Sequence, residues 1–222
     1  MSFADIRATT LDWLNRSDCT VIRANGFVQQ AQARIQRELR VPAMEKSVSA
    51  ALDTNGLYSS INIPSDFLET QRVEADGRII RATTPEHLLE MRSVSIATSP
   101  ASSINPVTVA GTVVPGAPSF FARVQGQLLL MPFPTSYATL YYYGQFAPLI
   151  VDTDGNSLLD FGWDCLLFGA LSYAGSFFRM DEVQEWEARY VAERDALRQL
   201  GQDADSGGGP MTVAAAYNGG YL

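Results

Sequence analysis

The residue best suited to acid–base chemistry in this sequence is its one histidine, His87, in the stretch Thr-Pro-Glu-His-Leu-Leu. Imidazole is a common general base because its pKa lies near neutral pH. No nucleophile elbow, Walker loop or dinucleotide-binding glycine motif occurs in the chain. One histidine also excludes metal sites built from several imidazoles. We therefore expect His87 to lie on a short surface helix, and we expect no catalytic residue, metal or cofactor.

Two aspartates, Asp152 and Asp154, stand before Gly155 in an arrangement similar to the start of a calcium loop. The glycine comes two positions too early, however, and residues 156–158 do not continue the ligand pattern. A turn before a helix is the better interpretation. The carboxylates of residues 181–187, Asp181-Glu182 and Glu185-Glu187, fit a solvated helix face better than an acid–base pair.

The remaining candidates for chemistry are two cysteines and a row of arginines. Cys19 and Cys165 are isolated in the sequence, so we expect both to be reduced structural thiols. Arg34, Arg37 and Arg40 could contact a phosphate. We expect them instead to pair with acidic neighbours, within the subunit or across an interface.

Composition narrows the classes further. The chain has 222 residues, enough for one large domain or two small ones, and a net charge of -8. The negative charge argues against a general affinity for nucleic acid, which needs clustered Lys and Arg. No run of 18 apolar residues is present and the first ten residues lack an apolar core, so we expect no membrane span and no signal peptide.

The stretch that organises the chain runs from about Val21 to Arg40. Its apolar residues recur at helical spacing and form one stripe: Val28, Ala31, Ile35 and Leu39. Val41-Pro42 ends the helix, because the residue before a proline is disfavoured in helical conformation. A shorter helix precedes it, with Ser2 and Asp5 forming a capping box. Asp18 or Thr20 could cap the second helix.

Two further helices are predicted near the C-terminus. Residues 156–179 have a broad apolar face, which includes Trp163, and we interpret them as one central helix. Asp181 then caps a last helix, which ends at Gly201. Its seam toward a neighbouring helix is formed by Val183, Trp186, Tyr190, Leu197 and Leu200.

Between these helical parts the period changes to that of strands. Strands are expected over residues 47–52, 57–63, 72–80, 120–124, 127–131 and 137–145. Asp76-Gly77 and Gln125-Gly126 are typical of hairpin turns. Residues 64–68 indicate a short helical turn, Thr84 can cap another at residues 85–91, and residues 95–118 are a long loop or weak β arm.

The predicted fold class is α+β: a bundle of N- and C-terminal helices with an inserted antiparallel β-rich subdomain and an extended C-terminal tail. The predicted parts are the N-terminal helices (1–42), the β insertion (43–150), the C-terminal helical hairpin (151–201) and a linker with a tail (202–222). Residues 202–209 have the composition of a flexible linker. The tail beyond them is apolar, and we expect it to dock on a partner through Met211, Val213, Tyr217, Tyr221 and Leu222.

Several segments, taken in order, carry a family resemblance. They are Thr10–Arg16, Ala31–Arg40, Leu57 with Ile61–Glu69, Thr84-Pro85-Glu86 before Leu88, Gln127–Pro132, Thr139–Gly144 and Trp186–Tyr190. Over about residues 3–200 the chain resembles the adaptor, or head-to-tail connector, proteins of tailed bacteriophages. Each segment alone is unspecific, and the order and spacing of the set carry the likeness.

The resemblance implies a structural virion protein at the head–tail junction, assembled in the host cytoplasm, with no enzymatic activity. Such adaptors form a homo-oligomeric ring, commonly of twelve copies, under the portal. The ring extends the DNA channel, through which DNA passes without sequence-specific binding, and offers a docking surface to the tail or nozzle protein. Family C-terminal tails can dock on the portal; here a neighbouring adaptor copy is the other candidate. Alternatives are a tail-completion or stopper protein on a similar scaffold, or a small hydrolase using His87 or a carboxylate pair.

Overall fold

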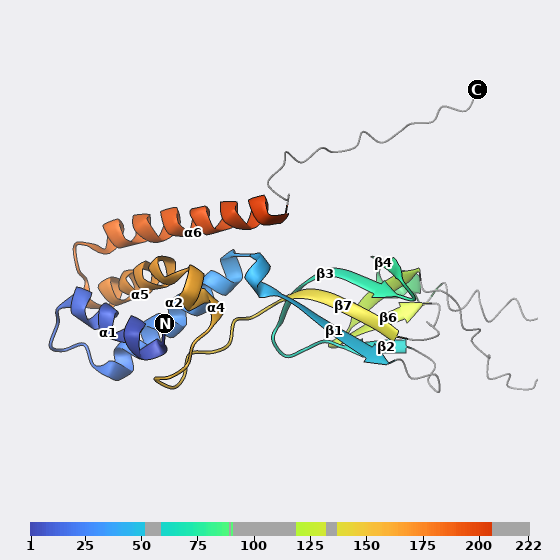
Figure 1. The fold of residues 1–222 in the computed structure, drawn as a ribbon, viewed down its shortest axis with the longest axis horizontal. Helices are drawn as coiled ribbons and strands as arrows, with labels where there is room; N and C mark the ends of the chain where they lie inside the picture. Colours follow the sequence, from blue (N-terminus) through green and yellow to red (C-terminus); the bar gives the residue numbers. More distant parts are fainter. Residues whose placement is uncertain (52–58, 89, 91–118, 132–136, 206–222) are drawn as a thin grey trace, which may run out of the picture. The chain divides into compact units, whose positions relative to one another are not determined.

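The computed structural model describes residues 1–51, 59–88, 90, 119–131 and 137–205 (Figure 1). Helix and strand are both abundant, which is consistent with the α+β class. The chain divides into two compact units. We call the first the helical unit; it combines residues 1–44 with residues from Phe146 onward. The second, the β unit, comprises Glu45–Gln145.

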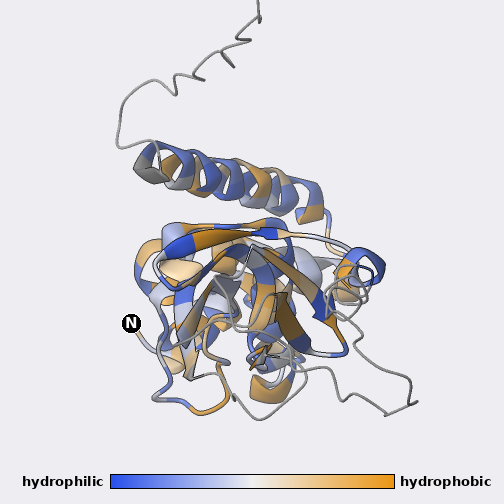
Figure 2. Ribbon diagram, turned by 90° about the vertical axis from the view of Figure 1, so that its right-hand side faces the viewer, coloured by the Kyte–Doolittle hydropathy of each residue, from blue (hydrophilic) through white to orange (hydrophobic). Residues whose placement is uncertain are grey.

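The helical unit contains α1 (Phe3–Leu14), α2 (Val21–Glu38), η1 (Pro42–Met44), α4 (Ser157–Phe161), α5 (Trp163–Phe178) and α6 (Val183–Asp205). The predicted stripe of α2 is confirmed: Val28, Ala31, Ile35 and Leu39 are all buried. α5 is the central helix, since α1, α2, α4 and α6 all pack against it. Figure 2 shows α6 as mostly hydrophilic, in keeping with its many charged residues.

The N-terminal caps form as the sequence predicts. Ser2 and Asp5 make the capping box of α1, and Thr20 rather than Asp18 caps α2 by accepting the Arg23 N–H. α2 ends at Glu38, slightly earlier than expected, because Leu39 already has extended backbone and turns its buried side chain into the core.

At two glycines the structure differs from the helices predicted from the sequence. The helix expected over residues 156–179 is broken at Gly162, where a Cβ would lie 2.8 Å from Leu158 Cδ1. Gly201 does not end the last helix; α6 continues to Asp205, so residues 202–205 are helical and not linker. α6 begins at Val183, two residues after Asp181.

The expected apolar faces are also partly wrong. Trp186, Tyr190 and Leu197 are buried as predicted, but Leu200 is 65% exposed. Trp163 is only half-buried, because it begins α5 directly after the break at Gly162.

The β unit contains β1 (Glu45–Ala51), β2 (Ser59–Asn62), β3 (Phe67–Ala75), β4 (Arg78–Ala82), β5 (Phe120–Val124), β6 (Gln127–Met131) and β7 (Tyr137–Gly144). They form one sheet in the order β1-β7-β3-β4-β5-β6-β2. The hairpins at Asp76-Gly77 and Gln125-Gly126 are confirmed, and both glycines have positive φ. Pairing is antiparallel except between β4 and β5, which are parallel.

The core of the β unit is aliphatic and aromatic. It gathers Ile61, Val73, Ile80, Phe121, Leu128, Leu130, Leu140 and Tyr142, together with two buried alanines. The helical turn expected at residues 64–68 is wrong: Pro64 O accepts the Phe67 N–H in a turn, and β3 starts at Phe67. Residues 95–118 lie outside the described residues.

Candidate interaction site

A polar network joins the helices of the helical unit. Arg34 of α2 donates to both Glu187 oxygens of α6, at 3.0 and 2.6 Å, and to Glu38 at 2.9 Å. Glu38 also accepts from the Tyr190 hydroxyl at 2.9 Å and from Arg194 at 3.0 Å. The Arg34 guanidinium lies over the Tyr190 ring, 4.1 Å from its centroid. We call these five residues, together with Ser172 of α5, the helical ion network.

Electrostatics within this network favour fixed charges. The Arg34 hydrogen bond holds the pKa of Glu187 below its usual value, with help from Ser172, whose hydroxyl donates to Glu187 at 2.6 Å. Burial raises the pKa of Glu38, but hydrogen bonds from Arg34, Arg194 and Tyr190 outweigh burial and leave that pKa lowered. Carboxylates this well satisfied hold helices together; they are poorly suited to take up a proton at neutral pH.

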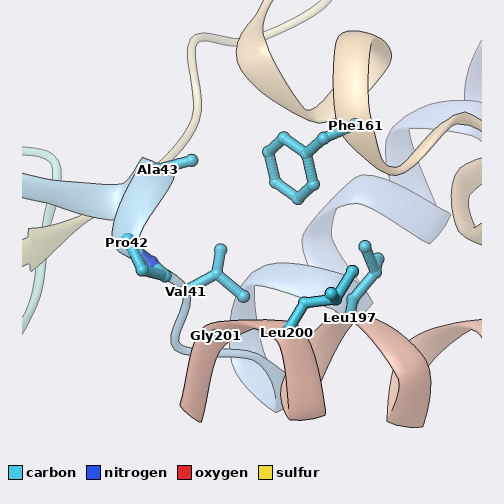
Figure 3. Close-up of a pocket in the computed structure, with 7 residues that line it drawn as sticks. All are labelled: Val41, Pro42, Ala43, Phe161, Leu197, Leu200 and Gly201. Carbon is cyan, nitrogen blue, oxygen red and sulfur yellow. The ribbon is translucent and has the colours of Figure 1, made fainter. Parts of the chain in front are cut away.

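An apolar pocket of about 220 Å³ opens beside the last turns of α6 (Figure 3). Its lining comes from three segments of the helical unit: Val41, Pro42 and Ala43; Phe161; and Leu197, Leu200 and Gly201. Gly201 supplies no side chain, and the nearest atoms to a Cβ built there lie 3.5 Å away. Phe161 and Leu200 are 39% and 65% exposed, so the pocket presents apolar surface to solvent.

A loop of residues 147–156 displays a second apolar feature. Its backbone is held by side chains of α2: Gln32 donates to Ala147 O and Gln29 to Leu149 O, each at 2.9 Å. At its tip, Ile150 and Val151 are 65% and 55% exposed. The loop therefore holds two adjacent aliphatic side chains in solvent.

The two aspartates of this loop bind groups of the protein itself. Asp154 Oδ2 accepts the N–H groups of Ile150 and Val151, at 2.7 and 2.8 Å. Asp152 pairs with Arg7 of α1, which lowers the pKa of Asp152. The predicted turn before a helix is confirmed, since Asn156 caps α4. Among the described residues, no group of three or more His, Cys, Asp or Glu side chains is placed to hold a metal ion.

Other sequence candidates fall into place individually. His87 is exposed at the start of a short helix that Thr84 caps, with its ring against Phe120. Cys19 and Cys165 are free and buried, and burial raises the pKa of the Cys165 thiol to about 12. Arg34 pairs with carboxylates as predicted, and Arg40 donates to the backbone oxygens of Gln36 and Leu39 among its interactions.

The solvated carboxylate face predicted for residues 181–187 is wrong at Glu187. Glu185 pairs with Arg189 on the exposed side of α6, as a solvated face requires. Glu187 instead faces α2 and α5, because Arg34 and Ser172 both bind it. Its partners lie far away in the sequence, so spacing within α6 could not reveal them.

The predicted partner-binding residues, Met211, Val213, Tyr217, Tyr221 and Leu222, lie outside the described residues, which end at Asp205. Sequence reasoning missed both the pocket beside α6 and the aliphatic tip at Ile150-Val151. Adjacent aliphatic residues before an Asp-x-Asp-Gly turn were the available signal for the tip. The pocket had no local signal, because three distant segments line it.

Comparison with known proteins now adds to this geometry. The family model of the SU10 adaptor protein matches residues 1–214, nearly the whole chain. The chain belongs to the SU10 adaptor protein family. This is a family of phage head-to-tail adaptors, so the resemblance drawn from the sequence is confirmed. A search among curated proteins gives no match.

Membership implies a structural part of the virion at the head–tail junction, in contact with portal and tail proteins. None of the adaptor's described helices is long and apolar enough to cross a membrane. The surfaces that matter in such a protein are those that bind other subunits. In the described part of the adaptor, the pocket beside α6 and the tip at Ile150-Val151 expose apolar side chains to solvent.

Proposed function

We propose that this adaptor assembles into a ring of identical copies between portal and tail. The ring has twelve copies, extends the DNA channel and offers a docking surface to the tail or nozzle protein. DNA passes through without sequence-specific binding, which agrees with the net charge of -8 on each copy. Subunits are assembled in the host cytoplasm. The observation that carries this proposal is the family match over residues 1–214.

The described residues support a structural role. Their most extensive polar cluster, the helical ion network, joins α2, α5 and α6. The Cys165 thiol, with a pKa of about 12, stays protonated and is a poor nucleophile. His87 is 52% exposed, and its Nδ1 lies 3.8 Å from a carboxylate oxygen of Glu90. None of these groups is arranged as a nucleophile with its base.

The grip on the portal is assigned to the C-terminal segment. Residues 210–222 carry no charged side chain and include Met211, Val213, Tyr217, Tyr221 and Leu222. An extended apolar peptide can follow a groove that a folded unit cannot enter. Each copy loses conformational entropy on binding, so each binds weakly, but a ring gains affinity through multivalency. The same residues could instead dock on a neighbouring adaptor copy.

Particle mass tests the ring. The purified chain, alone and mixed with its portal, is measured by native mass spectrometry, and we expect portal complexes carrying a fixed multiple of the 24.2 kDa subunit. Binding as single copies would contradict the ring. An image of the virion separates an adaptor, directly under the portal, from a stopper further along the channel. In the hydrolase alternative, His87→Ala would abolish infectivity with assembly intact; we expect infectivity to persist.

A second experiment tests the tail. Deleting residues 210–222 should leave the unfolding temperature almost unchanged and weaken attachment to portal-bearing heads. The matched control keeps the length of the chain and replaces the five named apolar residues by serine. Both variants should bind heads alike and more weakly than the intact protein. If the deleted protein binds as tightly as the intact one, the grip lies in the folded body.

A further inference from the structure

The loop of residues 147–156 is built more rigidly than a connection of its length requires. Gln29 and Gln32 hold its carbonyl groups from α2. The N–H groups of Phe3 and Ala4 donate to Asp154 O and Asp152 O, at 2.8 and 3.1 Å, so α1 holds it as well. Solvent-exposed loops are usually mobile and polar at their tips. In this loop, by contrast, many hydrogen bonds fix the positions of two exposed aliphatic residues, Ile150 and Val151.

A fixed aliphatic pair binds with a small entropy cost, because the loop that carries it loses little conformational entropy on association. Isolated exposed apolar residues are ordinary and need no explanation. Trp13 and Phe177, for example, are exposed, but each packs on a neighbouring ring, Phe168 and Phe27 respectively. Ile150 and Val151 differ from these two residues. They are adjacent, both are more than half exposed, and hydrogen bonds to α1 and α2 fix the loop that carries them.

The pocket beside α6 has the character to receive such a pair. All seven residues that line it are apolar or glycine. Its volume of about 220 Å³ exceeds the roughly 150 Å³ of a cavity that takes up benzene. Branched aliphatic side chains therefore fit. Filling the pocket would remove exposed apolar surface of Phe161 and Leu200 from water, which is favourable.

The loop cannot fill the pocket of its own chain. Hydrogen bonds to α1 and α2 hold it on the side of the helical unit opposite α6, where the gold segment after β7 runs in Figure 1. The pocket lies under the C-terminal end of α6. A projection and a recess on opposite sides of one subunit make a head-to-tail contact between copies, which is the contact that closes a ring.

Charges at the two surfaces agree with this pairing. Asp154 stands beside the aliphatic pair and accepts two backbone N–H groups, whereas Asp152 is already paired with Arg7. Near the pocket, the Arg40 guanidinium donates to the backbone oxygens of Gln36 and Leu39, whereas Arg198, one turn before Gly201, is paired with Asp195. In a contact between copies the negative charge of Asp154 approaches the positive charge of Arg40. Such rim charges orient the contact, while the buried apolar side chains supply most of the affinity.

We infer that Ile150 and Val151 of one adaptor copy insert into the pocket of Val41, Pro42, Phe161, Leu197 and Leu200 on the next copy, forming the repeating contact of the ring. The inference rests on the proposed ring and names the surfaces that close it. The occupant is a second copy of this chain. It binds through the loop of residues 147–156, which is already fixed in the single subunit.

Cysteine crosslinking tests the contact. The chain carrying both Ile150→Cys and Leu200→Cys is assembled on portal-bearing heads, oxidised and run on a non-reducing gel. Its native thiols, Cys19 and Cys165, are buried and should react slowly. A ladder of covalent multimers is expected, and each single-cysteine variant should remain a monomer. Ile22→Cys with Leu200→Cys is a matched control, because Ile22 is 82% exposed elsewhere on the helical unit; it should give no ladder.

The outcomes separate the inference from the proposed function. Rings that form without a ladder would overturn the inference and leave the ring standing. Failure of the intact chain to form any ring would overturn both. A further variant carries Leu200→Cys and Leu222→Cys. If it forms a disulfide within one chain while the Ile150→Cys/Leu200→Cys variant gives no ladder, the tail occupies the pocket and the inference is overturned.

Substitution gives a second readout. Ile150→Asp should lower ring formation about tenfold or more, because each contact loses a buried aliphatic side chain and buries a charge. Tryptophan emission should stay unchanged, since Ile150 is a surface residue in the free subunit. Ile22→Asp is the control and should assemble normally. Normal assembly of Ile150→Asp would contradict the inference.

Discussion

Each unit of this protein contains a buried tyrosine that donates to a carboxylate, and in each the carboxylate also binds a cation. In the helical unit Tyr190 donates to Glu38 at 2.9 Å, and Glu38 binds Arg34 and Arg194. In the β unit Tyr142 donates to Asp66 at 3.1 Å, and Asp66 binds Lys46 at 2.6 Å. The chemistry is similar, but the segments that it joins differ.

The difference lies in what the cations do. Arginine offers a planar fork of donors, and Arg34 uses it to bind Glu38 of its own helix and Glu187 of α6 at once. α2 and α6 come from the two ends of the chain, so the fork ties these ends together. Lys46 is a single charge on β1, an edge strand of a sheet that is already aligned by backbone hydrogen bonds. The helical unit therefore depends more on its side-chain network for alignment than the β unit does.

The largest expected effect comes from breaking this network at its centre. Tyr190 is fully buried, so Tyr190→Ala removes a packed ring and leaves Glu38 with one donor fewer. We expect a loss of about 3–5 kcal/mol in the free energy of unfolding. Urea unfolding followed by tryptophan fluorescence measures it, because all three tryptophans lie in the helical unit.

Tyr190→Phe is the control for the hydroxyl. It keeps the ring, and Glu38 keeps both arginines, so we expect a loss of only about 1 kcal/mol. Tyr142→Ala serves as the counterpart in the β unit and should be detected by circular dichroism more than by tryptophan fluorescence. A Tyr190→Ala protein as stable as the intact one would show that the network contributes nothing.

Adding one methyl group sharpens the comparison. At Gly175 of α5 a Cβ would lie 2.8 Å from both Trp186 and Val183, and the indole ring has little room to move. At Gly144 of β7 the obstacle is Lys46 Cδ at 2.7 Å, which belongs to a flexible side chain. Gly175→Ala should lower the free energy of unfolding by about 1–3 kcal/mol. Gly144→Ala should have a smaller effect, and equal losses in denaturant unfolding would contradict this ranking.

Acid should weaken the helical unit before the β unit. The folded pKa values of Glu38 and Glu187 lie below their ordinary value of 4.5. A lowered carboxyl pKa contributes stability that is fully present above the unfolded pKa and is lost as pH falls through the folded pKa. In the β unit the pKa of Asp66 is lowered from its ordinary value of 3.8, so its contribution begins to be lost only as the pH falls toward 3.8.

The acid prediction is checked by repeating urea unfolding between pH 6 and pH 3. The urea concentration at the midpoint of unfolding, followed by tryptophan fluorescence, should begin to fall at about pH 4.5 and should fall further as the pH is lowered. In Glu38→Gln the protein is less stable at neutral pH, and the dependence on pH is shallower. A dependence as steep as that of the intact protein would mean that Glu38 does not carry the effect.

Local signals in the sequence predicted local structure well. The Asp76-Gly77 and Gln125-Gly126 hairpins and the Ser2 and Thr20 caps depend on residues a few positions apart. Local sequence patterns fail at glycines whose role is decided by tertiary contacts. Gly162 breaks a helix that its apolar pattern would continue, while α6 runs through Gly201 because that position packs against residues 40–42.

The candidate site was harder to predict than the fold. Glu187 was assigned to solvent because its partner, Arg34, lies 153 positions away. The parallel pairing of β4 and β5 joins segments on either side of residues 89–118, so neighbouring residues gave no sign of it. The family resemblance came from the order of many weak segments, and the tail at residues 210–222 stays a prediction.

The smallest expected effect is a gain, at the position that sequence analysis took for a helix end. Gly201 lies inside α6, and a Cβ there meets Arg40 O, Pro42 Cδ and Val41 Cγ1 at 3.5 Å, which is ordinary contact. Alanine is better than glycine inside a helix by up to about 1 kcal/mol. Gly201→Ala should therefore stabilise the helical unit by a few tenths to about 1 kcal/mol, measured by tryptophan-detected urea unfolding. The same change at Gly175 should destabilise the protein. Both glycines lie in helices, so the difference between the two variants measures the effect of available space apart from that of helix propensity. If both changes destabilise, Gly201 has less room than its 3.5 Å contacts indicate, and packing outweighs helix propensity there.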